Sequence, residues 1–279
     1  MPKGKKINYW IQITVHWLTT IKTGNMNKLI IIVFLSALIV ACQTNTGKQT
    51  QIQYPSDFTK VLEAHGGIDQ WKKGRTLNFR IGDPTDGQKH TVDLHSRMDK
   101  ITTSDYEIGF DGIKAWVLNK EGKYQRNPTF MHDLMFYFYA MPFVLADEGL
   151  NYEKIIDKEI KGETYQGIKI SFEPGMGNSS GDEYYLYYDP ETYQMAWLAY
   201  KATFGKDKKP EWPNFISYDK WSNVGGVLLP TSIAWYSTEE GQIGEERNRV
   251  DFNSINLSQE AQPEAFYSKP ENAVFAEEE

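Results

Sequence analysis

Hydrophobic residues alternate with polar residues along much of the chain after position 75, and this period of two restricts the fold more than any other feature. In the first such segment, Leu77, Phe79 and Ile81 alternate with polar residues. This is the pattern of a β-strand with one buried face. Turn dipeptides such as Asp86-Gly87 separate successive segments. The sequence therefore predicts antiparallel strands joined by short turns.

The expected strands fall into two groups, before and after one helical segment. The strands are expected at 76–81, 91–96, 100–103, 106–110, 114–118 and 123–126, and then at 155–160, 164–172, 184–188, 195–204, 215–221, 227–229, 231–236 and 249–255. Aromatic residues make up 14% of the chain, and flat aromatic side chains favour the pleated surface of a sheet. We expect a single β-rich domain over residues 54–270, followed by an acidic tail over 271–279.

Two segments carry helical signals. Ser56 is a candidate N-cap, and Gly66 and Gly67 can end that helix in a left-handed conformation. His65 at this end suits a donor to the last free carbonyls, and we expect a structural role for it. Asn127 and Pro128 predict the start of a second helix. That helix is apolar on nearly every side, which predicts burial or contact with another apolar surface.

The N-terminal region has the features of an export signal. Lys28 lies two residues after Met26, and a continuous apolar run extends from Leu29 to Val40. Ala41 and Cys42 follow this run. Residues 39–42 resemble a bacterial lipobox, so we expect residues 1–41 to be removed and Cys42 to be acylated. Residues 42–53 would be a linker. We expect translation to start at Met26, so that residues 1–25 are an extension that does not belong to the protein.

Composition excludes several classes of function. Without residues 1–41 the chain has 25 basic and 37 acidic residues, a net charge of −12. Such a surface repels nucleic acid and anionic head groups, so membrane attachment should be covalent. Cys42 is the only cysteine, which excludes an internal disulfide and thiolate metal sites. No histidine spacing predicts a metal site and no glycine-rich phosphate loop is present, so no cofactor is expected.

Several short phrases resemble a family of uncharacterised Bacteroidetes lipoproteins, a domain of unknown function. These phrases are His65-Gly66-Gly67 with Trp71, Phe110-Asp111-Gly112 with Trp116, the run from Met141 to Asp147, and Asp189-Pro190-Glu191-Thr192 with Met195 and Trp197. The resemblance spans about residues 54–270. That family is distantly similar to the LolA/LolB-like periplasmic lipoprotein carriers. The resemblance implies a curved antiparallel sheet, a half-open barrel, closed by helices over an apolar cavity that holds acyl chains.

The candidate ligand site is a set of aromatic and methionine side chains that could line such a cavity. They are Trp116, Phe136, Phe138, Met141, Phe143, Tyr187, Trp197, Tyr200 and Trp235. Broad apolar side chains of this kind accept ligands of varied shape. For each residue alone, simple core packing is the more common role. The sequence favours a lipid-binding, membrane-tethered envelope protein, on the outer membrane and facing the periplasm because no acidic residue follows Cys42 closely.

Two other functions stay open. One is a structural or interaction module of the envelope, with a filled core and a surface for an unknown protein partner. The other is an envelope hydrolase, although no nucleophile motif or catalytic triad can be read from the spacing. We therefore expect no enzyme activity. A cavity between sheet and helix would favour lipid binding, whereas a cleft holding perturbed titratable groups would favour an enzyme.

The lipobox predicts that the chain is acylated at a single position. Cells fed labelled palmitate should attach the label to the parent chain and not to a Cys42→Ala variant, because the variant lacks the only thiol. In-gel detection of the label on the purified chain measures this. Equal labelling of the two chains would contradict the prediction.

Overall fold

The computed structural model describes residues 52–173, 181–203 and 208–277. Residues from Ile52 onward form a compact unit distinct from residues 1–51, and because this unit contains the sheet, the helices and a core of its own, it can fold independently. The expected signal segment and Cys42 lie outside the described residues. The strands are β1 (Thr76–Ile81), β2 (Gln88–Asp93), β3 (Asp99–Thr102), β4 (Tyr106–Phe110), β5 (Ala115–Asn119), β6 (Leu150–Ile160), β7 (Glu163–Phe172), β8 (Glu183–Tyr188), β9 (Met195–Lys201), β10 (Asn214–Val224), β11 (Val227–Glu239), β12 (Gln242–Ser258) and β13 (Val274–Phe275).

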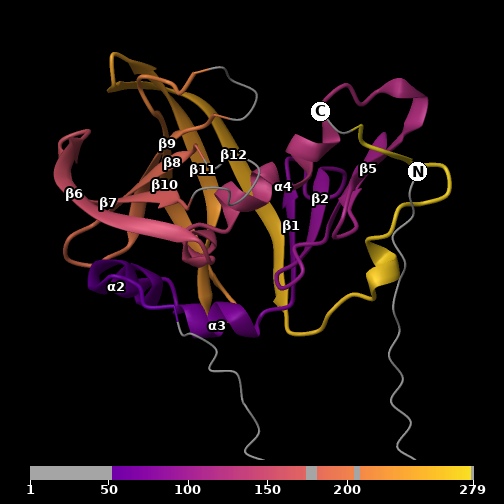
Figure 1. Ribbon diagram of the computed structural model, residues 1–279, viewed down its shortest axis with the longest axis horizontal. Coiled ribbons are helices and arrows are strands. Elements are labelled where there is room, and N and C mark those ends of the chain that lie inside the picture. The colour runs from indigo at the N-terminus through magenta and orange to yellow at the C-terminus, as the bar shows by residue number, and fades with distance from the viewer. Residues whose placement is uncertain (1–51, 174–180, 204–207, 278–279) are drawn as a thin grey trace, which may run out of the picture. The chain divides into compact units, whose positions relative to one another are not determined.

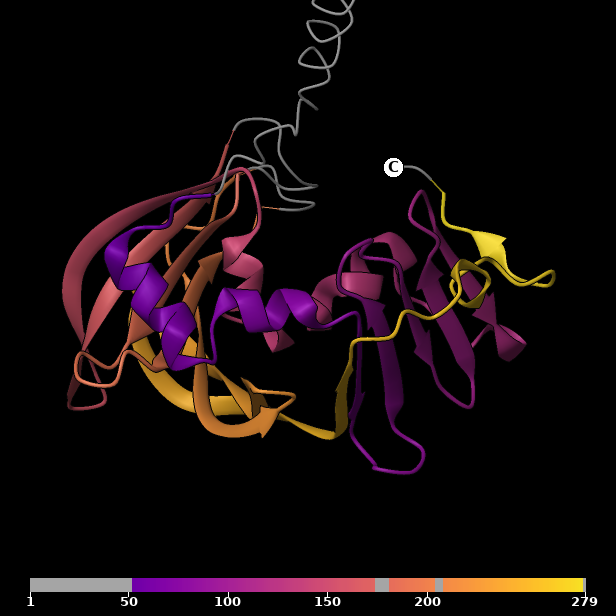
Figure 2. The same cartoon turned by 90° about the horizontal axis from the view of Figure 1, so that it is seen from below.

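The thirteen strands in the described part of the chain belong to one open sheet. Their order is β13-β5-β4-β3-β2-β1-β12-β11-β10-β9-β8-β7-β6, and every pair is antiparallel. The sheet consists of two meanders, β1–β5 and β6–β12, which meet where β1 pairs with β12 (Figure 1). The β6–β12 part curls strongly (Figure 2). The expected curved, open antiparallel sheet is confirmed.

Strand β12 joins the two meanders because it is long enough to serve both. Its first part pairs with β11 and its last part pairs with β1. Between these parts the register shifts: Arg80 lies opposite Asn253, but Asn78 lies opposite Asn256. β12 thus carries one extra residue there, and Ser254 in this stretch has a φ of 52°. A bulge of this kind bends the strand and turns it from one half of the sheet to the other.

The described residues also form three helices and three short 3-10 turns. They are α2 (Ser56–Ala64), α3 (Ile68–Lys73), η1 (Lys120–Gly122), α4 (Pro128–Tyr139), η2 (Phe143–Ala146) and η3 (Glu264–Phe266), of which α2 and α3 precede β1. The expected start of α4 is confirmed, since the Asn127 side chain accepts a hydrogen bond from the backbone N–H of Thr129 and Pro128 opens the helix. The expected end of α2 is confirmed as well, with φ values of 102° at Gly66 and 87° at Gly67.

The main hydrophobic core lies inside the curled part of the sheet. Helices α2 and α3 lie across this part (Figures 1 and 2), and Phe58, Leu62 and Trp71 contribute to its core. Phe143 of η2 is fully buried, and its ring stacks on Trp71 with centroids 4.7 Å apart. A satellite cluster on the sheet includes Ile160, Tyr187, Trp197, Ala199 and Phe215.

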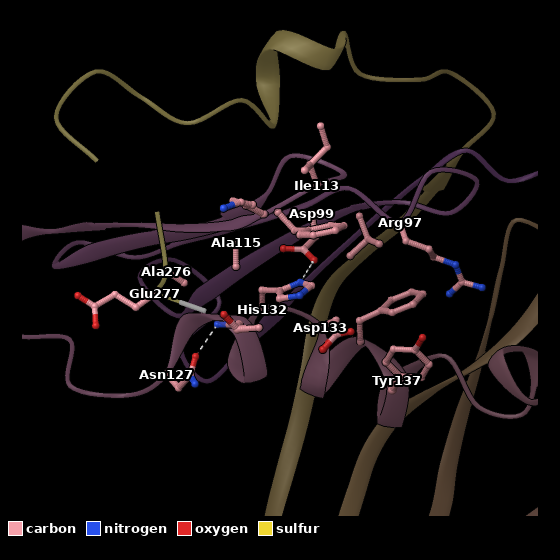
Figure 3. A pocket seen from close by; sticks show the side chains of 15 residues that line it. Arg97, Asp99, Ile113, Ala115, Asn127, His132, Asp133, Tyr137, Ala276 and Glu277 are labelled. Atoms are coloured by element: carbon pink, nitrogen blue, oxygen red, sulfur yellow. Dashed lines mark hydrogen bonds and ion pairs between the residues drawn. The ribbon is translucent and has the colours of Figure 1, made fainter. Parts of the chain in front are cut away.

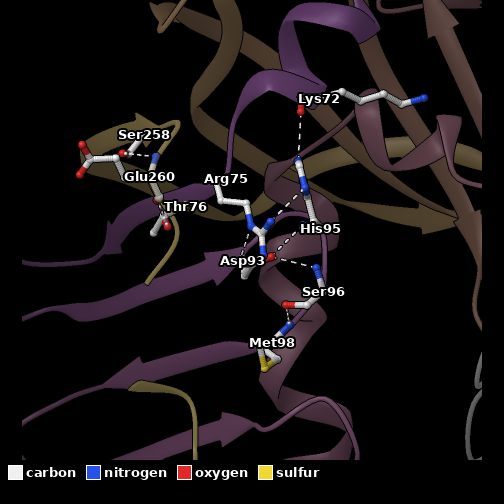
Figure 4. Close-up of polar contacts among 9 residues, drawn as sticks. All are labelled: Lys72, Arg75, Thr76, Asp93, His95, Ser96, Met98, Ser258 and Glu260. Carbon is white, nitrogen blue, oxygen red and sulfur yellow. Dashed lines mark hydrogen bonds and ion pairs between the residues drawn. The ribbon is translucent and has the colours of Figure 1, made fainter. Parts of the chain in front are cut away.

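A buried carboxylate fixes the turn between β2 and β3. Asp93 accepts hydrogen bonds from Arg75 Nε at 2.8 Å and from the backbone N–H groups of His95 and Ser96 (Figure 4). Burial favours the neutral form of Asp93, but these donors outweigh burial and lower its pKa. The turn leads directly into Arg97 and Asp99, so this carboxylate helps to position the pocket described below.

Several sequence expectations differ from the structure. The strand expected at 91–96 ends at Asp93, those expected at 227–229 and 231–236 form one strand, β11, and the N-cap of α2 is Pro55 and not Ser56. The segment 123–126 was expected as a strand and is irregular; the prediction was wrong because the preceding turn η1, with Glu121 at a φ of 58°, leads the chain away from the sheet. The sheet also extends into the expected tail, because β13 pairs with β5. Among the described residues, no helix is long and apolar enough to cross a membrane.

Replacing Phe143 by alanine should destabilise the unit strongly. The change removes a fully buried ring that stacks on Trp71, so we expect the free energy of unfolding to fall by about 3–5 kcal/mol. Urea denaturation followed by circular dichroism measures this. The control is Ile156→Ala, where the side chain is 89% exposed and the expected change is within about 0.5 kcal/mol. A similar small change in both variants would refute the described core.

Candidate functional site

A pocket of about 690 Å³ lies between helix α4 and the β2–β5 part of the sheet. Figure 3 shows its lining side chains, which come from both elements and from the end of the chain near residue 277. The lining residues are Val92, Arg97, Asp99, Phe110, Ile113, Lys114, Ala115, Asn127, Thr129, His132, Asp133, Phe136, Tyr137, Ala276 and Glu277. Apolar and charged side chains are both present, so the pocket is amphipathic.

The sequence brings these residues together through two periodicities. Successive side chains of a strand point to opposite faces, and Val92, Phe110 and Ala115 all face α4 from neighbouring strands. On α4, His132 and Phe136 are one turn apart, and residues at this spacing share a face. Thus one face of the sheet and one side of the helix together form the pocket.

A buried acid–histidine pair forms one wall of the pocket. His132 Nδ1 lies 2.5 Å from Asp99 Oδ2, and both side chains are almost completely buried. Burial disfavours the protonated form of His132, but the hydrogen bond to Asp99 and the charge of Asp99 outweigh burial and raise the pKa of His132. Burial also raises the pKa of Asp99. The two groups therefore hold a proton between them and titrate as one unit. The ring of Phe110 stacks on His132, with centroids 4.8 Å apart.

A second carboxylate faces the same space. Burial raises the pKa of Asp133 to about 6, and the positive charge of His132 only partly opposes this shift. Arg97, which also lines the pocket, forms an ion pair with Asp147 at 2.6 Å, and its guanidinium lies over the ring of Phe136. The pocket therefore has a titratable carboxyl group next to apolar surface.

The arrangement fits an amphipathic ligand better than a metal ion. No group of three or more potential metal ligands occurs among the residues that the structure describes. An Asp–His pair can orient an imidazole for proton transfer, but a hydrolase also needs a nucleophile. Thr129 is the one aliphatic hydroxyl in the pocket lining. Within the described part of the chain, no hydrogen bond joins it to His132.

The residues predicted from the sequence lie in four separate places. Phe136 alone lines the pocket, whereas Phe138, Met141 and Phe143 belong to the main core, with Tyr200 and Trp235 packed against it. Tyr187 and Trp197 belong to the satellite cluster. Trp116 is fully buried, and its Nε1 donates a hydrogen bond to the carbonyl oxygen of Tyr267. Ligand binding by this set therefore remains a prediction.

The His65 motif holds α2 on the sheet. His65 Nδ1 lies 2.7 Å from the carbonyl oxygen of Val61, and burial lowers the pKa of His65 to about 4. The neutral imidazole therefore acts as a donor at the helix end, as the sequence suggested. A Cβ on Gly66 would lie 2.3 Å from the Gly226 carbonyl oxygen, so this close approach requires glycine.

Sequence reasoning missed the acid–histidine pair. Asp99 and His132 are 33 residues apart, and no spacing rule connects a strand residue to a helix residue at that distance. One signal was available: His132 lies in an otherwise apolar helix, where a polar residue needs a buried partner.

A comparison with models of protein families gives one match. The model described as a family of unknown function, DUF6503, matches residues 110–245. Residues 110–245 belong to the DUF6503 family. This DUF6503 region includes helix α4, the pocket residues from Phe110 to Tyr137, and strands β6–β11. The expected membership of a domain of unknown function is confirmed. No curated protein sequence matches the chain.

Several solved structures are similar to the chain that contains this DUF6503 region. One is a LolA superfamily protein from Nitrosomonas europaea, with 12% identity over 75% of this chain and 96% of that one and a TM-score of 0.44. A DUF1329 family protein from Desulfovibrio piger has 11% identity over 76% and 95%, with a TM-score of 0.45. The lipoprotein LppX from Mycobacterium tuberculosis has 14% identity over 53% and 90%, with a TM-score of 0.23.

The raised pKa of Asp133, in the DUF6503 region, predicts that the difference in stability between the parent and an Asp133→Asn variant depends on pH. The folded protein keeps the proton on the carboxyl group of Asp133 up to about pH 6, whereas the unfolded chain releases this proton near pH 4. The free energy of unfolding therefore falls as the pH rises between these two values. An Asp133→Asn variant avoids that loss. Its free energy of unfolding should exceed that of the parent by up to about 2 kcal/mol at pH 7.5, with a smaller difference at pH 4.5.

Urea denaturation at the two pH values measures this difference. The matched control is Asp251→Asn, which makes the same chemical change at an exposed position on β12. A variant that is equally destabilised at both pH values would contradict the environment described for Asp133.

Proposed function

We propose that the mature protein is a lipid-anchored protein of the cell envelope that binds the apolar chain of a lipid beside α4, without catalysing a reaction. The observation that carries this proposal is the pocket of about 690 Å³. Small-molecule sites have volumes of about 300–1,000 Å³, mostly apolar walls and a few convergent polar groups. Val92, Phe110, Ala115 and Phe136 supply apolar wall, and His132 supplies a convergent polar group.

Burial of an acyl chain in this pocket would provide the affinity. Each buried methylene contributes about 0.8 kcal/mol, so several methylenes suffice without a strong polar contact. The pocket lining carries both signs of charge, with Arg97 and Lys114 beside the carboxylates of Asp133 and Glu277, so a head group with a single charge of either sign would also meet a like charge. We therefore expect a ligand with a neutral or zwitterionic head group, such as a monoacylglycerol or a lysophosphatidylcholine, rather than a free fatty acid.

The anchor part of the proposal rests on the sequence. The apolar run ends at Cys42, the only cysteine, and an acylated protein would hold its pocket close to the membrane that contains its ligand. An outer-membrane position facing the periplasm agrees with the absence of acidic residues directly after Cys42. A protein that binds lipid near a membrane needs no catalytic group.

The Asp99–His132 pair favours a second candidate, an ester hydrolase. Its imidazole is oriented by a carboxylate and lines the pocket, as a general base requires. This candidate predicts hydrolysis of short 4-nitrophenyl esters that a His132→Gln variant loses. Binding without turnover would leave lipid binding as the better description.

The test uses the chain from residue 43 and a fluorescent monoacylglycerol. We expect saturable binding, which the variants Ala115→Phe and Thr129→Trp should each weaken at least about tenfold, because the larger side chains fill the pocket at a strand and at the helix. Ile156→Trp, at an exposed position on β6 that does not line the pocket, should leave the affinity unchanged. Thermal unfolding checks that each variant folds.

Co-purified lipid provides an independent readout. Native mass spectrometry and solvent extraction of the purified chain should find a bound acyl lipid that the Ala115→Phe variant lacks. If no lipid is extracted and neither monoacylglycerol nor lysophosphatidylcholine binds, the proposal fails. In that case a structural or interaction role becomes the better interpretation.

A further inference from the structure

A second pocket lies along the same strands, on the opposite side of α4. Its volume is about 310 Å³. Along β2, β3 and β4 its residues are His90, Ile101 and Ile108, each two positions from a residue of the first pocket. They therefore share the face of the sheet that α4 covers. The complete lining is Gln88, His90, Ile101, Tyr106, Ile108, Lys123, Tyr124, Gln125, Arg126, Met131 and Met135.

The floor of this second pocket contains an unsatisfied histidine. His90 is 2% exposed, its ring stacks on Phe79 with centroids 4.5 Å apart, and neither ring nitrogen has a hydrogen-bond partner among the described residues. Burial lowers the pKa of His90 to about 3, so the ring is neutral and offers one donor and one acceptor. Buried polar groups are normally paired, and His90 faces a space that a ligand can fill.

Tyr124 adds a second group of the same kind. Its hydroxyl is buried and has no hydrogen-bond partner within the described part of the chain. Its ring lies against that of Tyr106, with centroids 4.8 Å apart. His90 and Tyr124 line one pocket, so a ligand group that both donates and accepts, such as a hydroxyl, matches both of them.

The second pocket differs in charge from the first, whose lining includes both cations and carboxylates. Lys123 and Arg126 line the second pocket, and no Asp or Glu does, although the domain as a whole is acidic. Lys123 is paired with Asp105 at 2.8 Å. Arg126 forms no ion pair with any described residue. An exposed, unpaired guanidinium at a pocket recognises a carboxylate.

The size of the pocket and its walls restrict the rest of the ligand. A volume of about 310 Å³ is at the lower end for small-molecule sites, so it suits one ring rather than a long acyl chain. Met131 and Met135 of α4 and the ring of Tyr106 provide apolar and aromatic surface. Such surface favours a flat apolar body between the two polar ends.

We propose that this second pocket binds a small aromatic carboxylate that carries a ring hydroxyl. The carboxylate pairs with Arg126, the hydroxyl bonds to His90 and Tyr124, and the ring lies against Met131 and Met135. This site is separate from the lipid pocket and does not depend on the function proposed for it.

The test is isothermal titration calorimetry of the chain from residue 43 with 4-hydroxybenzoate, 4-hydroxyphenylacetate and 3-(4-hydroxyphenyl)propionate, which differ in length. At least one should bind saturably at one site. For that acid, the analogue without the hydroxyl and the analogue with an uncharged amide should each bind at least about tenfold more weakly. Absence of saturable binding by all three acids overturns the proposal, and the pocket then holds water only.

Two variants test the two ends of the ligand separately. Arg126→Gln should weaken binding of the acid at least about tenfold and leave binding of the amide unchanged, because only the acid is anionic. His90→Phe keeps the stacked ring and should weaken binding of the hydroxy acid but not of the acid without the hydroxyl. The matched control is Arg247→Gln, an exposed arginine of β12 with the same change of charge.

The outcomes are distinguishable from those of the lipid test. Arg126 is exposed, so its replacement keeps the fold and remains decisive even if His90→Phe does not fold. Equal affinities in the parent and the Arg126→Gln variant overturn the assigned site. Ala115→Phe fills only the first pocket, so it should weaken monoacylglycerol binding and leave binding of the hydroxy acid unchanged.

Discussion

Burial of α4 on the β2–β5 meander is the interaction on which both pockets depend. The helix is apolar on most sides, and it places His132, Phe136 and Phe138 against the rest of the domain. Transfer of such side chains out of water is the main driving force that holds the helix there. The side chains of α4 do not fill all of the space between the helix and the sheet. A pocket therefore remains on each side of α4.

Much of the fold could be predicted from periodicity and turn signals, and the missed parts have separate physical causes. The strands β1–β5 alternate apolar and polar residues and face α4, so the sequence revealed them. The first part of β12 carries a run of polar residues from Glu245 to Arg249, exposed or half-exposed, and its pairing with β11 rests on backbone hydrogen bonds that leave no hydrophobic pattern. The segment 123–126 has a strand-like composition, yet the turn before it removes it from the sheet.

The site was harder to predict than the fold, because its chemistry lies in residues that meet only in three dimensions. Large aromatic residues suggested a cavity, but most of them fill the core, as side chains of their size usually do. The polar residues of the pocket linings include Asp99, His132 and Asp133 in one pocket and His90 in the other. Isolated polar residues in apolar segments were therefore the more informative signal, since burial requires each of them to have a partner.

The pairing of β1 with β12 has a consequence for how the chain folds. Thr76 lies opposite Ser258, so nearly the whole domain must be synthesised, and under the export hypothesis translocated, before β1 acquires its second neighbour. Contacts between such distant residues form slowly because a long loop must first close. Until then β1 is an unprotected strand edge, and such edges promote aggregation. The first meander therefore depends on its own hairpins and on α4 for protection during folding.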